Sequence, residues 1–174
     1  NLDDLFTILQ WNEQNSIKVF RISNNLFSHR NQFRLHQLSR YKEIFQKLTK
    51  IGNFVKDKGH RLSFHADHYS VLASQKDYVT ENAIQDINFF SDIFDHMGFE
   101  ETPYHKINVH VSTSKPLKED ASRRFIEAYK RLNNSAQRRI TVENDDKIGG
   151  FSVKDLYDFI YKKIKIPIEI GRAH

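Results

Sequence analysis

Residues 61–69, with the sequence RLSFHADHY, contain the short alternating pattern that decides the fold prediction. Leu62 and Phe64 are apolar and alternate with polar neighbours, which is the pattern of a β-strand with one buried face. The pattern stops at His65, so this imidazole stands at the carboxyl end of the predicted strand. Because residues two apart in a strand share a face, His65 lies on the polar face, opposite the two apolar side chains.

Four other short runs are rich in β-branched or aromatic residues and have the same character. They are residues 17–23, 106–111, 138–143 and 165–170. Between the runs, apolar residues recur every three or four positions, as in an amphipathic helix. These helical periods cover residues 2–11, 38–55, 79–97, 125–132 and 153–160. Strands that alternate with helices predict a parallel α/β fold.

Local signals predict where three of the helices begin or end. Gly59 and Gly98 each follow a helical period, at the position where glycine commonly ends a helix. Ser152, followed three residues later by Asp155, predicts a capping arrangement at the start of the last helix.

The polar face of the strands separates the two main parallel α/β architectures. Asn108 and His110 in one strand, and Thr141 and Glu143 in another, alternate with apolar residues. Strands of an open doubly wound sheet are apolar on both faces, whereas a barrel can hold polar groups near its carboxyl mouth. We therefore predict a TIM barrel. A complete barrel takes ~250 residues, so residues 1–174 are expected to be one domain and an incomplete barrel that lacks the first strand and the last strands.

Composition restricts the classes of site and partner. The chain contains no cysteine, so a bound metal would need His, Asp or Glu ligands. No stretch approaches the ~20 apolar residues of a membrane helix, and the first residues do not resemble a signal peptide, so we expect an intracellular, cytoplasmic protein with no membrane partner. The net charge of +5 is compatible with a polyanion, but the basic residues are dispersed, which leaves a nucleic-acid partner open.

Three successive predicted strands end in a possible metal ligand, namely His65, His110 and Glu143. Parallel strands would bring these groups to one rim, where two imidazoles and a carboxylate suit a divalent cation. Each residue also has a structural alternative: a histidine can be hydrogen-bonded in place, and Glu143 can accept from turn amides. His29, after the first strand, is a fourth candidate ligand.

Other catalytic classes lack their signatures. The chain has no Gly-rich phosphate loop, no cysteine nucleophile and no G-x-S-x-G elbow, which leaves metal-assisted hydrolysis or isomerisation. His68 and Tyr69 belong to the loop after the strand that ends at His65, and they could stack on a nucleobase. Alternatively, Tyr69 packs beneath that loop.

Four stretches, in this order along the chain, resemble the UV damage endonucleases, which are metal-dependent DNA repair enzymes on a TIM barrel of the xylose isomerase-like group. They are NLDDLFTILQWNEQNSIKVFRISNNLF, RLSFHADHYSVLAS, INVHV and RRITVENDD. The resemblance implies cleavage of damaged double-stranded DNA 5′ to UV photoproducts and other distorting lesions. It also implies up to three divalent ions, most commonly Mn²⁺.

The resemblance further implies roles for individual residues. His65, His110, Glu143 and His29 match metal ligands, and Glu143 and His110 are implied to be catalytic. The pair His68 and Tyr69 matches a Gln-Tyr pair that probes the lesion, with histidine in place of glutamine.

The end of the chain departs from the family pattern. Gly171 stands where the family has an aspartate ligand, and His174 stands at the position of a histidine ligand. We therefore expect a partial metal site and little or no nicking by the 174 residues alone. Unpaired barrel edges are also expected to promote association.

Two other functions remain compatible with the sequence. A metal-dependent sugar isomerase-like barrel would share the strand-end histidine and glutamate pattern. A non-catalytic DNA-binding remnant of the enzyme would bind DNA without metal.

Overall fold

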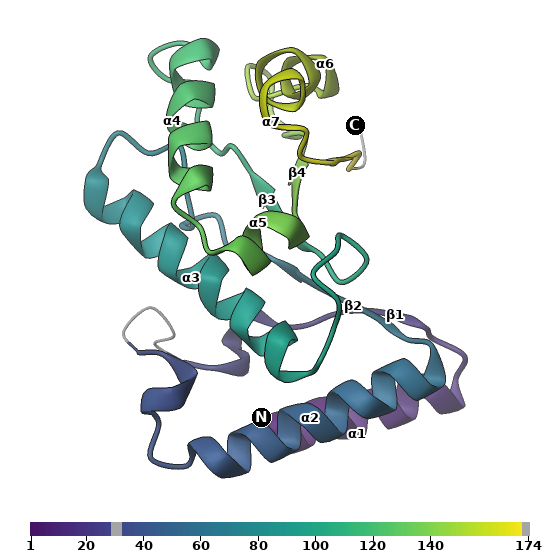
Figure 1. The fold of residues 1–174 in the computed structure, drawn as a ribbon. Helices are drawn as coiled ribbons and strands as arrows, with labels where there is room; N and C mark the ends of the chain where they lie inside the picture. Colours follow the sequence, from purple (N-terminus) through teal and green to yellow (C-terminus); the bar gives the residue numbers. More distant parts are fainter. Residues whose placement is uncertain (29–32, 172–174) are drawn as a thin grey trace.

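The protein is described by a computed structural model that covers residues 1–28 and 33–171. Five parallel strands form one sheet in sequential order (Figure 1). The strands are β1 (Val19–Arg21), β2 (Arg61–His65), β3 (Ile107–His110), β4 (Ile140–Glu143) and β5 (Ile168–Glu169). The sheet is not closed, because β1 and β5 are its two outer strands. This is the incomplete α/β barrel predicted from the alternation of strands and helices, the polar strand faces and the chain length.

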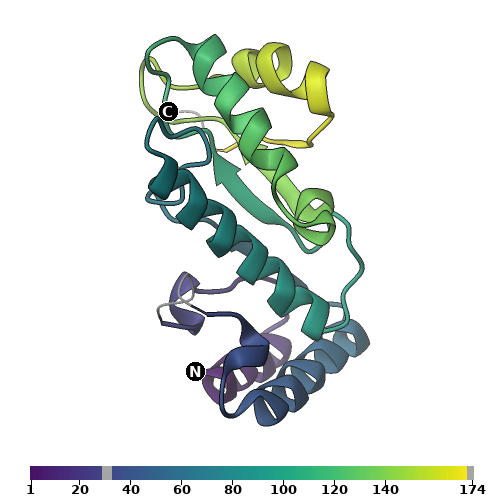
Figure 2. The same cartoon turned by 60° about the vertical axis from the view of Figure 1, so that its left-hand side comes forward.

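Helices connect the strands and cover their apolar face. The longer ones are α1 (Leu2–Gln14), α2 (Tyr41–Lys58), α3 (Asp77–His96), α4 (Lys118–Lys130) and α5 (Asn134–Arg139). The last connection consists of α6 (Val153–Leu156), the π-helical turn η4 (Tyr157–Tyr161) and α7 (Lys162–Ile164). Among the described residues after β1 are the 3₁₀ turns η1 (Asn24–Leu26) and η3 (Leu35–Gln37). In both ribbon views, α1 and α2 lie side by side at one end of the molecule, and α6 and α7 lie at the opposite end (Figures 1 and 2).

The core lies between the helices and the apolar face of the strands. Leu62 and Phe64 of β2 are completely buried, and the Phe64 ring stacks on Phe90 of α3 with ring centroids 4.4 Å apart. Full burial of one such side chain contributes about 1.5–3 kcal/mol. Gly52 allows α2 to approach the end of α3, since a Cβ at this position would lie 1.9 Å from the carbonyl oxygen of Met97.

The predicted helix ends are confirmed. Gly59 ends α2 with a φ of +65°, and Gly98 follows α3 with a φ of +71°, both in the left-handed region that favours glycine. At the start of α6, the backbone N–H of Asp155 donates to Oγ of Ser152 at 3.2 Å. The backbone N–H of Ser152 donates in return to Oδ2 of Asp155 at 2.9 Å, which completes the capping box.

The predicted boundaries of the first, fourth and fifth strands are wrong, and β1 covers only 19–21 of the predicted 17–23. Arg138 and Arg139, expected in the fourth strand, are the last residues of α5. Asn133 caps this helix by accepting from the backbone N–H of Ala136 at 2.7 Å, and the buried Arg139 guanidinium anchors its last turn to Asp95 of α3. The last predicted strand begins three residues late, because Lys165 ends α7 with a left-handed φ of +57°.

Side chains near the two outer strands are exposed. Val19 in β1 is 63% exposed, and Ile170, just after β5, is 72% exposed. Association through these edges stays a prediction. In the described part of the chain, no helix combines the length and the apolar character needed to cross a membrane.

Candidate metal centre

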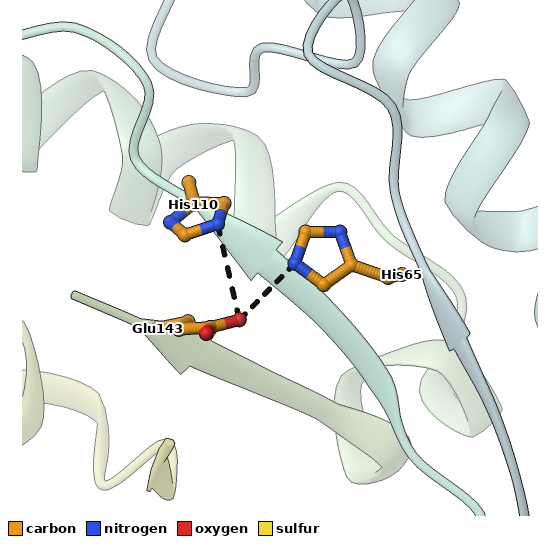
Figure 3. A group of neighbouring side chains, drawn as sticks. All are labelled: His65, His110 and Glu143. Atoms are coloured by element: carbon orange, nitrogen blue, oxygen red, sulfur yellow. Dashed lines mark hydrogen bonds and ion pairs between the residues drawn. The ribbon is translucent and has the colours of Figure 1, made fainter. Parts of the chain in front are cut away.

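His65, His110 and Glu143 meet at the carboxyl rim of the sheet (Figure 3). One ligand atom from each of the three lies within 4.8 Å of the other two. Nε2 of His65 is 3.1 Å from Oε2 of Glu143, and Nε2 of His110 is 3.8 Å from the same oxygen. The parallel register explains this meeting, since His110 and Glu143 are directly paired residues of β3 and β4.

Both imidazoles turn the same nitrogen toward the carboxylate. Nδ1 of His65 lies 3.0 Å from the carbonyl oxygen of Ala66, which can only accept, so Nδ1 carries the proton. Nδ1 of His110 lies 3.4 Å from Oδ1 of Asp145. A histidine whose Nδ1–H faces an acceptor presents Nε2 as a metal ligand, an arrangement common at metal sites.

The three side chains are accessible from solvent. The side chain of His65 is 20% exposed, and those of His110 and Glu143 are 18% exposed. A cation can therefore reach them, while most of each side chain is held by the surrounding protein.

The charges beside His110 favour its protonated form. The Asp145 carboxylate beside Nδ1 raises the pKa of His110 against the effect of burial, and the negative charge of Glu143 also raises it. Burial raises the pKa of Asp145, but the nearby His110 imidazole and the hydrogen bond from the backbone N–H of Phe151 outweigh burial and lower that pKa. An excess of negative charge thus surrounds the imidazole, which suits a cation.

Two open pockets meet at this group. One, of about 630 Å³, is lined by residues 20–25 and by all three residues of the group. The other, of about 460 Å³, lies between the loops after β3 and β4 and includes Ser112 and Lys147. His68, His110 and Asp146 line both pockets. A ligand that spans the two pockets would therefore lie against these three side chains.

His68 and Tyr69 project from the loop after β2. Both are exposed, and Tyr69 is 89% exposed, so the alternative that it packs beneath the loop is wrong. The loop is fastened by Asn24, whose Nδ2 donates to the carbonyl oxygen of His65 and to Oδ1 of Asp67, both at 2.6 Å. Sequence reasoning missed Asn24, because its partners lie more than 40 residues away.

The remaining predicted ligands have different outcomes. His29 and His174 lie outside the described residues. Gly171 lies against the group: its N–H donates to Oδ1 of Asn144 at 2.9 Å, and a Cβ at this position would be 2.2 Å from Oε1 of Glu143. The turn-amide alternative for Glu143 does not describe its side-chain contacts, since Oε2 of Glu143 accepts from Nδ2 of Asn108 and lies 3.1 Å from Nε2 of His65.

Comparisons with known proteins agree with this fold. The family model of UV-endonuclease UvdE matches residues 1–174. A UV DNA damage endonuclease of Clostridium perfringens is 33% identical over 177 residues, which cover 100% of this chain and 41% of that protein. One of Bacillus thuringiensis subsp. konkukian is 30% identical over 176 residues, covering 100% of this chain and 53% of that protein. The chain therefore spans about half the length of these relatives.

Solved structures give the same result. The crystal structure of SacUVDE superposes with a TM-score of 0.86 and 35% identity, over 98% of this chain and 56% of that one. A 3-keto-D-glucoside 4-epimerase from E. coli has a TM-score of 0.54 at 12% identity, over 88% of this chain and 66% of that one, which is a likeness of fold alone. The match of a family model to every residue, together with relatives at 33% and 30% identity, shows that the chain belongs to the UV-endonuclease UvdE family.

Proposed function

We propose that the chain supplies part of the metal-binding site of an endonuclease that cuts the DNA phosphodiester bond 5′ to UV photoproducts and other distorting lesions. The observation that carries the proposal is the meeting of His65, His110 and Glu143 within 4.8 Å at the ends of three adjacent strands. Family membership supports DNA as the substrate, and parallel barrels hold their chemistry at this rim.

The donor set fits a divalent cation. Two imidazole nitrogens and a carboxylate oxygen are suitable ligands for Mn²⁺, Zn²⁺ or Fe²⁺, and the resemblance favours Mn²⁺. In phosphodiester hydrolysis, such an ion supplies charge stabilisation at the phosphoryl oxygens and a water of lowered pKa. His65, His110 and Glu143 would hold one ion, and the family pattern suggests up to three.

We assign separate catalytic and DNA-contacting roles to individual residues of the chain. Glu143 and His110 are the proposed catalytic residues, because they present a carboxylate and an Nε2 atom at the rim where the two pockets meet. His68 and Tyr69 are proposed to contact the damaged duplex, since both are exposed in the loop beside this rim. An unstacked base gains about 1–3 kcal/mol by stacking on an aromatic side chain.

The partner and location follow from the same proposal. Damaged double-stranded DNA is the partner, which the net charge of +5 favours, and an intracellular location follows from the substrate. The sugar isomerase alternative gains nothing from the epimerase, whose 12% identity supports the fold only.

Metal binding by the 174-residue chain tests the first half of the proposal. Titration with Mn²⁺, followed by the electron paramagnetic resonance signal of free Mn²⁺, should show a site that Glu143→Gln weakens by at least about tenfold. Glu100→Gln, which changes an exposed acid after α3, is the matched control and should bind as the unchanged chain does. Equal binding by both variants would contradict the proposed site.

DNA incision tests the second half. The substrate is a duplex with one UV photoproduct at a known position, and the full-length Clostridium perfringens relative is the positive control. We expect little or no nicking by the 174-residue chain, and any nick that it makes should lie 5′ to the photoproduct and depend on Glu143. Nicks that ignore the lesion would argue against the proposal, whereas lesion binding that needs neither Mn²⁺ nor Glu143 would support the non-catalytic alternative.

A further inference from the structure

Behind Glu143, two buried polar side chains form a line of hydrogen bonds along the polar face of the sheet. Oγ1 of Thr141 donates to Oδ1 of Asn108 at 2.8 Å, and Nδ2 of Asn108 donates to Oε2 of Glu143. Asn108 and Thr141 are directly paired residues of β3 and β4. Asn108 lies two residues before His110, and Thr141 lies two residues before Glu143, so all four share one face of the sheet. Asn108 and Thr141 are only 5% and 4% exposed, so water competes little for these bonds.

The chemistry of the three groups fixes the direction of the line. An ionised carboxylate only accepts hydrogen bonds, so Asn108 must turn its NH₂ group toward Glu143. Its amide oxygen then faces Thr141, whose hydroxyl can donate to it. A flipped amide would place an oxygen against the carboxylate, which repels it. Thr141 therefore acts on Glu143 only through the orientation of Asn108.

We propose that Asn108 and Thr141 are positioning residues that hold the carboxylate of Glu143 where it can bind a divalent cation together with His65 and His110. This inference rests on the metal site of the proposed function. A carboxylate that is already held loses less side-chain freedom when the ion binds. The line also holds Oε2 on the side of the rim to which both imidazoles turn their Nε2 atoms.

Mn²⁺ affinity in four variants tests whether Thr141 acts on Glu143 through Asn108. Asn108→Leu removes both bonds at similar side-chain volume and should weaken Mn²⁺ binding roughly 10- to 100-fold. Thr141→Val removes only the outer bond and should weaken it by about fivefold, whereas Thr141→Ser keeps the hydroxyl and should restore most of the affinity. The double variant should bind as weakly as Asn108→Leu alone, because Thr141 acts through Asn108.

Ser63→Ala is the matched control. Ser63 lies on the same polar face in β2, and its side chain stands outside the line, so the change should leave Mn²⁺ affinity unaltered. The line is overturned if Thr141→Ser binds as weakly as Thr141→Val, or if the Asn108 and Thr141 effects add independently. Thermal unfolding of each variant, followed by circular dichroism, separates a fold defect from a loss of positioning.

A measurement without metal tests the hydrogen bonds from Thr141 through Asn108 to Glu143 separately from the proposed metal site. In the NMR spectrum without metal, one side-chain N–H proton of Asn108 should be shifted downfield and should exchange slowly. The shift should disappear in Glu143→Gln and decrease in Thr141→Val. If the shift is present but the unchanged chain does not bind Mn²⁺, the proposed function and the positioning role both fail, although the bonds exist. If Glu143→Gln weakens Mn²⁺ binding but the chemical shift of the Asn108 proton is the same in all variants, only the proposed positioning role is wrong.

Discussion

Oδ1 of Asp145 lies 3.4 Å from Nδ1 of His110, across the imidazole ring from the Nε2 atom that approaches Glu143. Asp145 is itself held, because its Oδ2 accepts from the backbone N–H of Phe151 at 2.7 Å. An acid behind a histidine fixes the ring orientation and the tautomer, and it makes the other nitrogen a better ligand. The loop after β4 thus supports His110, the proposed ligand in β3.

Asp145→Asn should weaken Mn²⁺ binding at the proposed site without removing a proposed ligand. The new amide oxygen could still accept from Nδ1 of His110, but the side chain would no longer contribute a negative charge. We expect Mn²⁺ affinity to fall about tenfold, as measured by titration. Asp57→Asn is the matched control, since Asp57 is an exposed acid near the end of α2 that lines neither pocket, and it should leave the affinity unchanged. An equal loss in the control would show that overall charge, not the position of Asp145 behind His110, sets the affinity.

Gly171→Ala should also weaken Mn²⁺ binding while it leaves the fold intact. The added Cβ would lie 2.2 Å from Oε1 of Glu143, which is the end of a flexible side chain, so the carboxylate must move. The movement costs little unfolding free energy but displaces a proposed ligand. Gly149→Ala is the control: its added Cβ meets nothing within 4 Å, although its φ of +83° adds local strain. Unchanged Mn²⁺ affinity in Gly171→Ala would mean that Oε1 does not contribute to binding.

The sequence predicts the rim of the sheet well because the signal is local. In β2, β3 and β4, alternation separates the faces within four or five residues, and it stops at the histidine or glutamate. Any parallel sheet must then gather these ends at one edge. The meeting of His65, His110 and Glu143 therefore follows from three short patterns and one topology.

The features that sequence reasoning missed depend on contacts between distant segments. Asn24 fastens the loop after β2 through partners 41 and 43 residues away. The last turn of α5 is helical where a strand was predicted, and its Arg139 is paired with Asp95, 44 residues earlier. Gly171 lies against Glu143 only because β5 pairs with β4. No local periodicity reports such contacts.

Tyr69→Ala should lower the preference for damaged DNA. Its ring is 89% exposed beside the rim, and loss of one base–aromatic stack costs about 2 kcal/mol. Fluorescence anisotropy with a duplex containing one photoproduct should show this loss, while binding to the undamaged duplex should change little. Tyr78→Ala, at the start of α3 and 63% exposed, is the matched control. An equal loss on both duplexes would mean that Tyr69 does not read the lesion.

His105 should make the fold less stable in acid. Burial lowers the pKa of His105 to about 4, and the charges of Arg139 and Arg61 act in the same direction. The ring stacks on Phe99 with centroids 3.8 Å apart, and Nδ1 lies 3.2 Å from the backbone nitrogen of Leu62. A neutral imidazole can accept from that N–H.

The sign of the effect follows from the two pKa values. Above the ordinary pKa of 6.5, His105 is neutral in both states and its contribution is complete. Between 6.5 and about 4, the unfolded chain takes up a proton that the folded chain does not, so the free energy of unfolding falls as the pH falls. The total loss is on the order of 3 kcal/mol.

Urea unfolding between pH 7 and pH 4 measures this dependence. His105→Phe keeps an aromatic ring beside Phe99 but cannot titrate, so its stability should fall less steeply over this range than that of the unchanged chain. It should also be less stable at pH 7, because the N–H of Leu62 loses its acceptor. His36→Gln removes an exposed histidine and should keep the original slope. Identical slopes for all three proteins would refute the role of His105.

Two adjacent arginines at the end of α5 should differ sharply in their effect on stability. The side chain of Arg139 is completely buried; it donates to Oδ1 of Asp95 at 2.6 Å and to the carbonyl oxygen of Phe99 at 2.8 Å. Arg138 forms an ion pair with Glu101 at the surface, with 63% of its side chain exposed.

Arg139→Leu leaves partners of a buried cation without their donor, and the free energy of unfolding should fall by about 3 kcal/mol. Arg138→Leu breaks an exposed pair and should change it by less than about 1 kcal/mol. Urea unfolding at pH 7 measures both values in the same buffer. Because the two residues share a helix turn and the same substitution, helix propensity contributes about equally to each, so the difference between them reports burial. Equal losses would mean that the buried guanidinium contributes no more than the exposed one.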